Sequence, residues 1–272
     1  MAINDISLTA GMRSNLLQLQ TTTKLIDRTQ ERLSTGKQVN SALDNPTNFF
    51  AAQAHVNRAS DFSVRKDGMA EAIQTVKASD AGITAISALV EAAKGLAAAA
   101  LGTSNTVDRG SFSTQFQTLI TQINTLASDS GYRGTNLLTG ATLTVNFNEN
   151  ASSNLAVAGF TATNAGLTIA GTGLNAWTND GDITLSQANL STATNELRKQ
   201  SKNLANNLNI ITTRQQFTDN MISTLNTGAD NLTLADMNQE GANMLMLQTR
   251  QNLGTTALSL SSQAAQSVLR LF

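Results

Sequence analysis

The sequence has no cysteine, one proline, one tryptophan and one tyrosine among its 272 residues, and aromatic residues make up only 4% of it. Without cysteine, no disulfide can staple the fold. Few large rings and many small residues favour helices packed closely along their length over a thick central core. The formal net charge is −1, so we expect no nucleic acid partner and no electrostatic attraction to an anionic membrane.

A signal peptide and a long apolar run are also missing. Asp5 lies where the apolar core of a signal peptide would begin, and the first basic residue is Arg13. No run of about 18 apolar residues is present, so we expect no membrane insertion. A cytosolic protein fits this pattern, and so does a protein exported without a cleaved signal.

Residues suited to catalysis or metal binding are scarce. His55 is the only histidine, and without cysteine it cannot anchor a zinc site of the usual His/Cys kind. The segment Gly171–Gly173 lacks the second half of a phosphate loop and its following helix, so we interpret it as a turn. We therefore expect no metal, no cofactor and no enzymatic activity.

Helical periodicity is the strongest positive signal. Apolar residues recur at steps of three and four from Met12 to Leu33 and again from Ala242 to Leu271, which places them on one face of a helix. We expect the first helix to end at Gly36. The last should begin at a capping box of Thr233 and Asp236. Its apolar stripe runs to the final residue, and such a stripe needs a partner.

Three further helices and a short β region are expected between these two. The helices should cover about residues 46–102, 112–131 and 186–228, each closed by glycine. Between residues 141 and 181, apolar residues alternate with polar ones at 143–147, 155–157 and 167–169, which predicts one or two β-hairpins. The predicted fold class is mainly α, a long antiparallel helical bundle or coiled coil with a small β-hairpin insert.

Three separate stretches resemble bacterial flagellins. Residues 32–46 read RLSTGKQVNSALDNP, which is similar to the family's N-terminal signature. Residues 132–138 read YRGTNLL and resemble the family's Phe-Asn-Gly segment, with Tyr132 and Arg133 replacing Phe-Asn. Residues 266–272, QSVLRLF, resemble its C-terminal helix. The residues that match the N-terminal signature are Arg32, Leu33, Gly36, Asn40, Ser41, Ala42 and Asp44.

The resemblance implies a domain organisation. Residues 1–40 and 231–272 would supply the two helices of an inner (core) domain. Residues 41–140 and 183–230 would form the two parts of a rod domain. Residues 141–182 would form a short β-rich insert that faces solvent.

The resemblance also implies a function: a structural subunit that self-assembles into the extracellular flagellar filament for motility after type III export. The implied partners are further copies of the chain, the flagellar cap and hook-associated proteins, and an export chaperone at the C-terminal helix. The motif that the innate flagellin receptor recognises in many family members aligns with residues 91–97. There Ala92 and Gly95 replace an arginine and an acidic residue, so we expect weak binding to that receptor.

We expect the terminal helices to order only on polymerisation. Each has too narrow an apolar stripe to fold stably alone, so residues near 1–40 and 233–272 should fold as they stack on neighbouring copies. The expected polymerisation core consists of Leu16, Leu19, Ile26, Leu33, Met246, Leu253, Leu260, Val268 and Leu271.

Two other functions stay open at this stage. A hook–filament junction protein has similar termini and would be present in only a few copies per cell. A surface adhesin or binding module would use the central insert, with Trp177 as an exposed aromatic contact.

Overall fold

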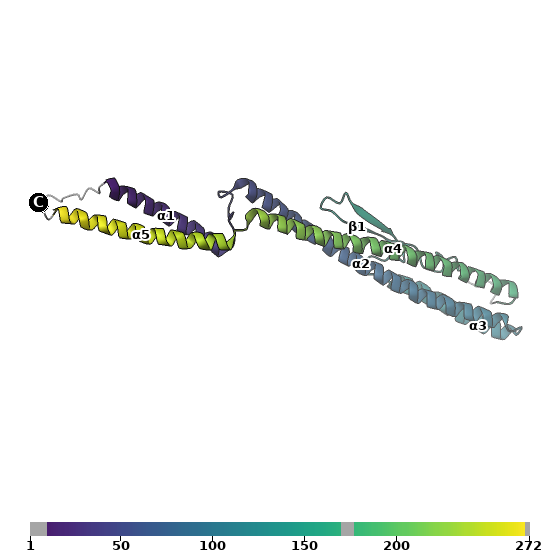
Figure 1. Cartoon of the computed structure of the whole chain (residues 1–272). Coiled ribbons are helices and arrows are strands. Elements are labelled where there is room, and N and C mark those ends of the chain that lie inside the picture. Colours follow the sequence, from purple (N-terminus) through teal and green to yellow (C-terminus); the bar gives the residue numbers. More distant parts are fainter. Residues whose placement is uncertain (1–9, 170–176, 270–272) are drawn as a thin grey trace, which may run out of the picture. The chain divides into compact units, whose positions relative to one another are not determined.

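The computed structural model describes residues 10–169 and 177–269, and within them the chain forms five helices and one two-stranded sheet (Figure 1). The elements in chain order are α1 (Ala10–Thr35), α2 (Pro46–Leu101), α3 (Thr106–Asp129), β1 (Thr142–Asn146), β2 (Asn154–Ala158), α4 (Asp180–Thr233) and α5 (Met237–Leu269). Two compact units result: a terminal unit of Met1–Asn57 with Thr224–Phe272, and a central unit of Arg58–Ser223. The mainly helical fold with a small β-hairpin is thereby confirmed.

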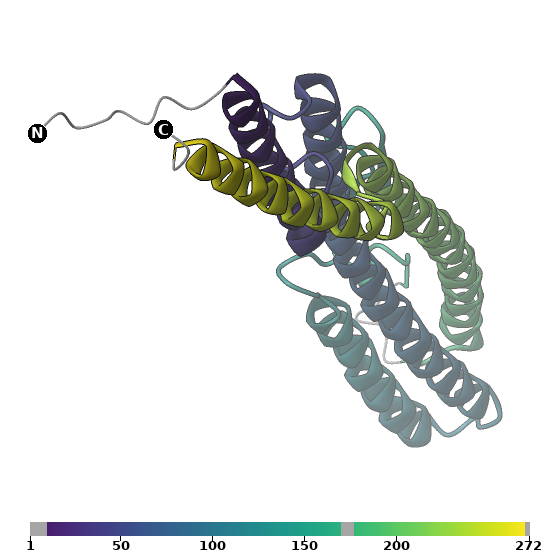
Figure 2. The same ribbon diagram turned by 60° about the vertical axis from the view of Figure 1, so that its left-hand side comes forward.

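The central unit has a closed apolar core. Its portion of α2 runs alongside both α3 and α4 (Figure 2). Ile86 and Val90 of α2, Phe116 and Ile123 of α3 and Leu190 of α4 are all fully buried in one cluster. Burying a side chain of this size stabilises the fold by about 1.5–3 kcal/mol. This unit therefore supplies its own core without a second copy.

The β1–β2 hairpin covers part of that core with one face. The strands pair antiparallel, with Val145 opposite Leu155 and Leu143 opposite Val157. Val145 and Val157 are buried and belong to the core cluster. The predicted strand at Leu167 and Ile169 is wrong: both side chains are buried, but residues 163–169 form turns in place of a second hairpin. Alternating burial can therefore arise in a turn that packs onto a bundle.

Trp177 lies in this core and not on the surface. It is fully buried, its ring centroid lies 4.9 Å from that of Phe116, and its Nε1–H donates a hydrogen bond to Ser186 Oγ at 3.3 Å. The expectation of an exposed aromatic contact is wrong, because the indole fills the space between α3 and the start of α4. The adhesin hypothesis loses the residue on which it depended.

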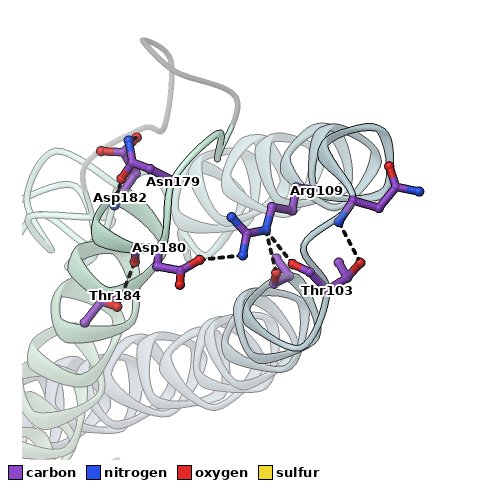
Figure 3. A network of polar contacts seen from close by, with 8 residues as sticks. Thr103, Arg109, Asn179, Asp180, Asp182 and Thr184 are labelled. Atoms are coloured by element: carbon purple, nitrogen blue, oxygen red, sulfur yellow. Dashed lines mark hydrogen bonds and ion pairs between the residues drawn. The ribbon is translucent and has the colours of Figure 1, made fainter.

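A buried arginine connects the helix ends at one extremity of the central unit (Figure 3). Arg109 Nε donates to the carbonyls of Ala100 at 3.1 Å and Thr103 at 2.6 Å, and its Nη2 pairs with the carboxylate of Asp180. The Asp180 carbonyl in turn accepts from the Thr184 hydroxyl at 2.8 Å. One side chain thus ties the end of α2 to the starts of α3 and α4.

Two predicted helix boundaries near the C-terminus are wrong. α4 continues through Gly228 to Thr233, since Leu225 and Ala229 are buried on either side and their packing offsets the ~1 kcal/mol cost of a helical glycine. The N-terminus of α5 is capped by Asp236, whose carboxylate accepts from the N–H groups of Asn238 at 2.9 Å and Gln239 at 3.2 Å. Thr233 belongs to the preceding helix.

Among the described residues one helix, α2, is long and apolar enough to cross a membrane, by length and composition alone. Core helices of soluble proteins share this length and composition. Ile83, Ile86 and Val90 of this helix are buried against other parts of the central unit.

Replacing the buried indole tests this core. Trp177→Ala should lower the free energy of unfolding of the central unit by about 3–5 kcal/mol, because it leaves a cavity beside Phe116. Trp177→Phe should lower the free energy of unfolding by less, because an aromatic ring still fills most of the space. Its remaining cost includes the lost hydrogen bond to Ser186. Urea unfolding followed by far-UV circular dichroism measures both. An unchanged unfolding midpoint for Trp177→Ala would contradict the burial.

Candidate assembly surface on the terminal helices

In the terminal unit, α1 and α5 pack side by side along one stripe each (Figures 1 and 2). On α1 the stripe carries the buried Thr22 and Thr29 between half-buried leucine and isoleucine side chains. On α5 it carries the buried Leu247 and the half-buried Leu258 at helical spacing. The stripe contains few large side chains, so the helices approach closely.

The two helices approach closely at Gly254. A Cβ placed there would lie 2.8 Å from Leu19 Cδ2 and 3.1 Å from Leu19 Cγ, which is shorter than normal contact. The Leu19 side chain therefore occupies the space that a larger residue at position 254 would need. At Gly241 of the same helix, by contrast, an added Cβ would meet no atom within 4 Å.

A second apolar stripe of α5 is largely exposed in the described part of the chain. Met246 is 51% exposed, Leu253 66% and Leu260 62%. At 3.6 residues per turn these positions lie roughly 100–140° around the helix from Leu247. Near the start of the stripe, a shallow hollow is lined by Leu245, Met246, Thr249, Arg250 and Leu253. α5 thus carries one stripe that α1 covers and another that is open.

The predicted polymerisation core divides into residues that are half-buried in the α1–α5 pair and residues that are exposed. Leu19, Ile26 and Leu33 are half-buried in the terminal pair. The exposed members are Leu16, Met246, Leu253 and Leu260. The side chain of Val268 and all of Leu271 lie outside the described residues. The role of the set in polymerisation stays a prediction.

Two exposed residues were missed by the sequence argument. Leu17 is 64% exposed and Leu245 is 67% exposed, and each directly adjoins a predicted core residue. A search for one three-and-four pattern excludes such neighbours. Two consecutive leucines or a Leu-Met pair on an otherwise amphipathic helix would have been the usable signal.

The signature residues join α1 to the C-terminal part of the chain. Arg32 Nη1 forms an ion pair at 2.9 Å with the carboxylate of Glu240, which is buried in α5. Gly36 has a φ of 71°, which favours glycine, and its carbonyl accepts from the N–H of Ala235 at 2.9 Å. The N–H of Gln38 donates to the carbonyl of Thr233 at 2.8 Å. The loop after α1 is therefore pinned to the α4–α5 connection.

Asp44 holds the rest of that loop in shape. Its carboxylate accepts from the N–H groups of Asn40 at 3.1 Å and Ser41 at 2.9 Å, and from the Ser41 hydroxyl at 3.1 Å. The backbone N–H groups of Ser41 and Asn40 lower the pKa of Asp44 from its ordinary value of 3.8. Ala42 is half-buried beside this turn.

The described residues contain no group of three or more His, Cys, Asp or Glu side chains that could hold a metal ion. His55 is half-buried on α2 and lies next to Gly228 of α4 within the terminal unit. What the arrangement offers chemically is apolar surface on paired helices.

Comparison with known proteins identifies one family. Residues 3–142 match the family described as bacterial flagellin N-terminal helical region. Flagellin FljM of Caulobacter vibrioides is 29% identical over 276 residues, and flagellin FljK of the same organism is 30% identical over 283 residues; each match covers 100% of both chains. A flagellin of Brucella melitensis is 29% identical over 268 residues, which is 94% of this chain and 95% of its own. The crystal structure of Bacillus cereus flagellin has a TM-score of 0.48 at 18% identity, covering 56% of this chain and 88% of its own.

Two glycine variants test the close contact of α1 with α5. Gly→Ala in a helix normally stabilises it by about 1 kcal/mol, and Gly241→Ala should show this gain. Gly254→Ala should lose it, because the new methyl group displaces Leu19 at an overpacking cost of about 1–3 kcal/mol. The concentration of subunits that stays unassembled at equilibrium measures the effect of each variant: it should fall for Gly241→Ala and should not fall for Gly254→Ala. Equal values for the two variants would contradict the close contact.

The turn at Asp44 predicts a pH-dependent contribution to stability. Because the folded pKa is lowered, the contribution is complete above the unfolded pKa, near 3.8, and is lost as pH falls through the folded value. Asp44→Asn should lower the melting temperature of assembled protein at neutral pH. The difference from wild type should shrink below about pH 4. A difference that is constant from neutral to acid pH would exclude this role.

Proposed function

The chain belongs to the bacterial flagellin family and is a structural subunit of the flagellar filament, and we propose that its terminal helices complete their packing on neighbouring copies. The observation that carries this proposal is the open stripe of Met246, Leu253 and Leu260 on α5. Exposed apolar residues at heptad spacing are costly in water, and covering each one gains about 1.5–3 kcal/mol.

The energetics of a lone helix pair favour coupled folding and assembly. Fixing each backbone residue costs about 1–2 kcal/mol, and most helical stability in proteins comes from packing of an apolar face. In the terminal pair, α1 and α5 cover only one stripe of each other, and much of that stripe is small or polar. We infer that residues near 1–40 and 233–272 order when several neighbours cover the remaining surface.

The same surface accounts for filament growth. Open stripes on an elongated pair contact different surfaces of adjacent copies, so the contacts are heterologous. When such contacts do not close a ring, they produce an open helical filament. Assembly of this kind requires no catalytic group, and we infer that the chain acts structurally and not as an enzyme.

The finer partners follow as further proposals. Family membership supports export through the flagellar type III channel, an extracellular location, and assembly beneath the cap onto the hook-associated proteins. Before assembly, the open stripe of α5 would need cover, which supports an export chaperone bound to that helix. The full-length relatives above are named flagellins, and with Trp177 buried nothing favours a junction protein or an adhesin.

Removal of the end of α5 tests the proposed assembly role. Deleting residues 253–272 should abolish filaments, because it removes Leu253 and Leu260 from the open stripe. The central unit should stay folded, with Trp177 fluorescence still blue-shifted and protected from quenching. Electron microscopy after seeding and fluorescence of the monomer measure the two outcomes. Normal filaments from the shortened chain would refute the mechanism.

Point substitutions distinguish the contribution of the open stripe to assembly from the contribution of α5 as a whole. Leu253→Ser combined with Leu260→Ser should raise the unassembled concentration by about 100-fold or more, since each loses an apolar burial of about 1.5 kcal/mol or more. Val107→Ser, which alters a residue 77% exposed on the central unit, is the matched control and should have a smaller effect. A larger effect of Val107→Ser would argue against the open stripe.

Receptor recognition gives an independent prediction. Ala92 and Gly95 are exposed on α2, and Glu91 is engaged by Lys94 at 3.0 Å. An exposed arginine and acid are therefore missing from this face, and we propose weak binding to the innate flagellin receptor. Reporter cells should respond poorly to purified monomer. Robust activation at nanomolar dose would contradict the proposal.

A further inference from the structure

Methionine is the only sulfur-containing residue type in the chain, which has seven methionines and no cysteine. Three of the seven, Met237, Met244 and Met246, fall in the first ten residues of α5. Met69, by contrast, is fully buried in the core of the central unit. Oxidisable sulfur is therefore concentrated on one of the two helices that carry the proposed assembly surface.

Met246 occupies a distinctive position among these residues. It is 51% exposed and lines the shallow hollow of α5 together with Leu245 and Leu253. It precedes Leu253 and Leu260 by one and two heptads, so it is the sulfur-containing member of the described part of the open stripe. Met237 is 47% exposed but lies nine residues earlier, about 180° around the helix.

We propose that Met246 is a reversible oxidation site that decides whether a free subunit can add to the filament. The proposal rests on the proposed role of the open stripe. The oxidant is a hydroperoxide: a sulfur lone pair attacks one peroxide oxygen, the O–O bond breaks, and the second oxygen leaves as water or an alcohol. Sulfur is oxidised by two electrons to the sulfoxide and the peroxide is reduced.

The sulfoxide changes the surface in the way that matters for assembly. A thioether is flexible and apolar and fills irregular gaps, whereas a sulfoxide is polar and presents a strong hydrogen-bond acceptor. Its neighbours within the hollow are the apolar Leu245 and Leu253 and the polar Thr249 and Arg250. Burying an unpaired acceptor against a neighbouring subunit costs enough to weaken addition about 10- to 100-fold.

The exposure of Met246 in the single chain restricts its oxidation to subunits that have not yet assembled. The Met246 side chain is open in the single chain, and contact with the next copy would bury it. Peroxide should therefore act on free subunits and spare those already assembled. Methionine sulfoxide reductases reverse the reaction, so an oxidised subunit regains its apolar surface.

Peroxide treatment of purified monomer tests the proposal. Wild type, Met246→Leu and Met237→Leu are exposed to dilute hydrogen peroxide, the sulfoxide at each methionine is quantified by mass spectrometry, and seeded elongation is followed. Oxidised wild type and oxidised Met237→Leu should elongate at least about tenfold more slowly than untreated protein. Oxidised Met246→Leu should elongate normally, and a sulfoxide reductase should restore the wild type.

A measurement on wild type alone keeps the test decisive if a variant assembles poorly. After partial oxidation, Met246 sulfoxide should be enriched in the unassembled fraction, while Met237 sulfoxide should be distributed evenly. Even distribution of both, or equal peroxide sensitivity of Met246→Leu and wild type, would overturn the proposal. Normal assembly of the Leu253→Ser, Leu260→Ser variant would instead count against the assembly surface itself.

Discussion

The packing of α1 against α5 along a single narrow stripe is the constraint from which the rest of the terminal unit follows. Two helices can cover only the faces they turn toward each other, and here those faces carry threonines and a glycine as well as leucines. The contact at Gly254 brings the helices close at the expense of apolar area. The large side chains at 246, 253 and 260 are left outside. The α1–α5 pair therefore leaves large apolar side chains exposed.

The central unit, unlike the terminal helix pair, encloses its apolar core within a single copy. Three helices, a hairpin and the Trp177 indole enclose one continuous apolar cluster, and Arg109 satisfies carbonyls and a carboxylate where the helices end. The buried members of this cluster all lie within the central unit. One chain thus combines a core that is complete in a single copy with a helix pair that is not, and the long helices α2 and α4 contribute residues to both units.

Periodicity in the sequence predicted the helices, the Gly36 terminus and the β1–β2 hairpin, because each depends on local spacing or local backbone geometry. Tertiary packing decided the remainder. Gly228 stays helical between buried neighbours, and Trp177 is buried by a bundle that its own segment does not reveal. On α5, periodicity found the open stripe and missed the covered one, since small and polar residues such as Gln251 and Gly254 interrupt the latter.

The backbone hydrogen bonds between the loop after α1 and the α4–α5 connection can form only when both segments are present. Gly36 pairs with Ala235, and Gln38 with Thr233, so the closing strand-like contact joins segments from opposite ends of the chain. Main-chain groups make these bonds, and substitution of side chains leaves the donors and acceptors in place. Either of the two segments lacks its hydrogen-bonding partner until the other is present. A product that terminates before Thr233 therefore cannot close this junction, whereas one that loses only the end of α5 keeps both bonding segments.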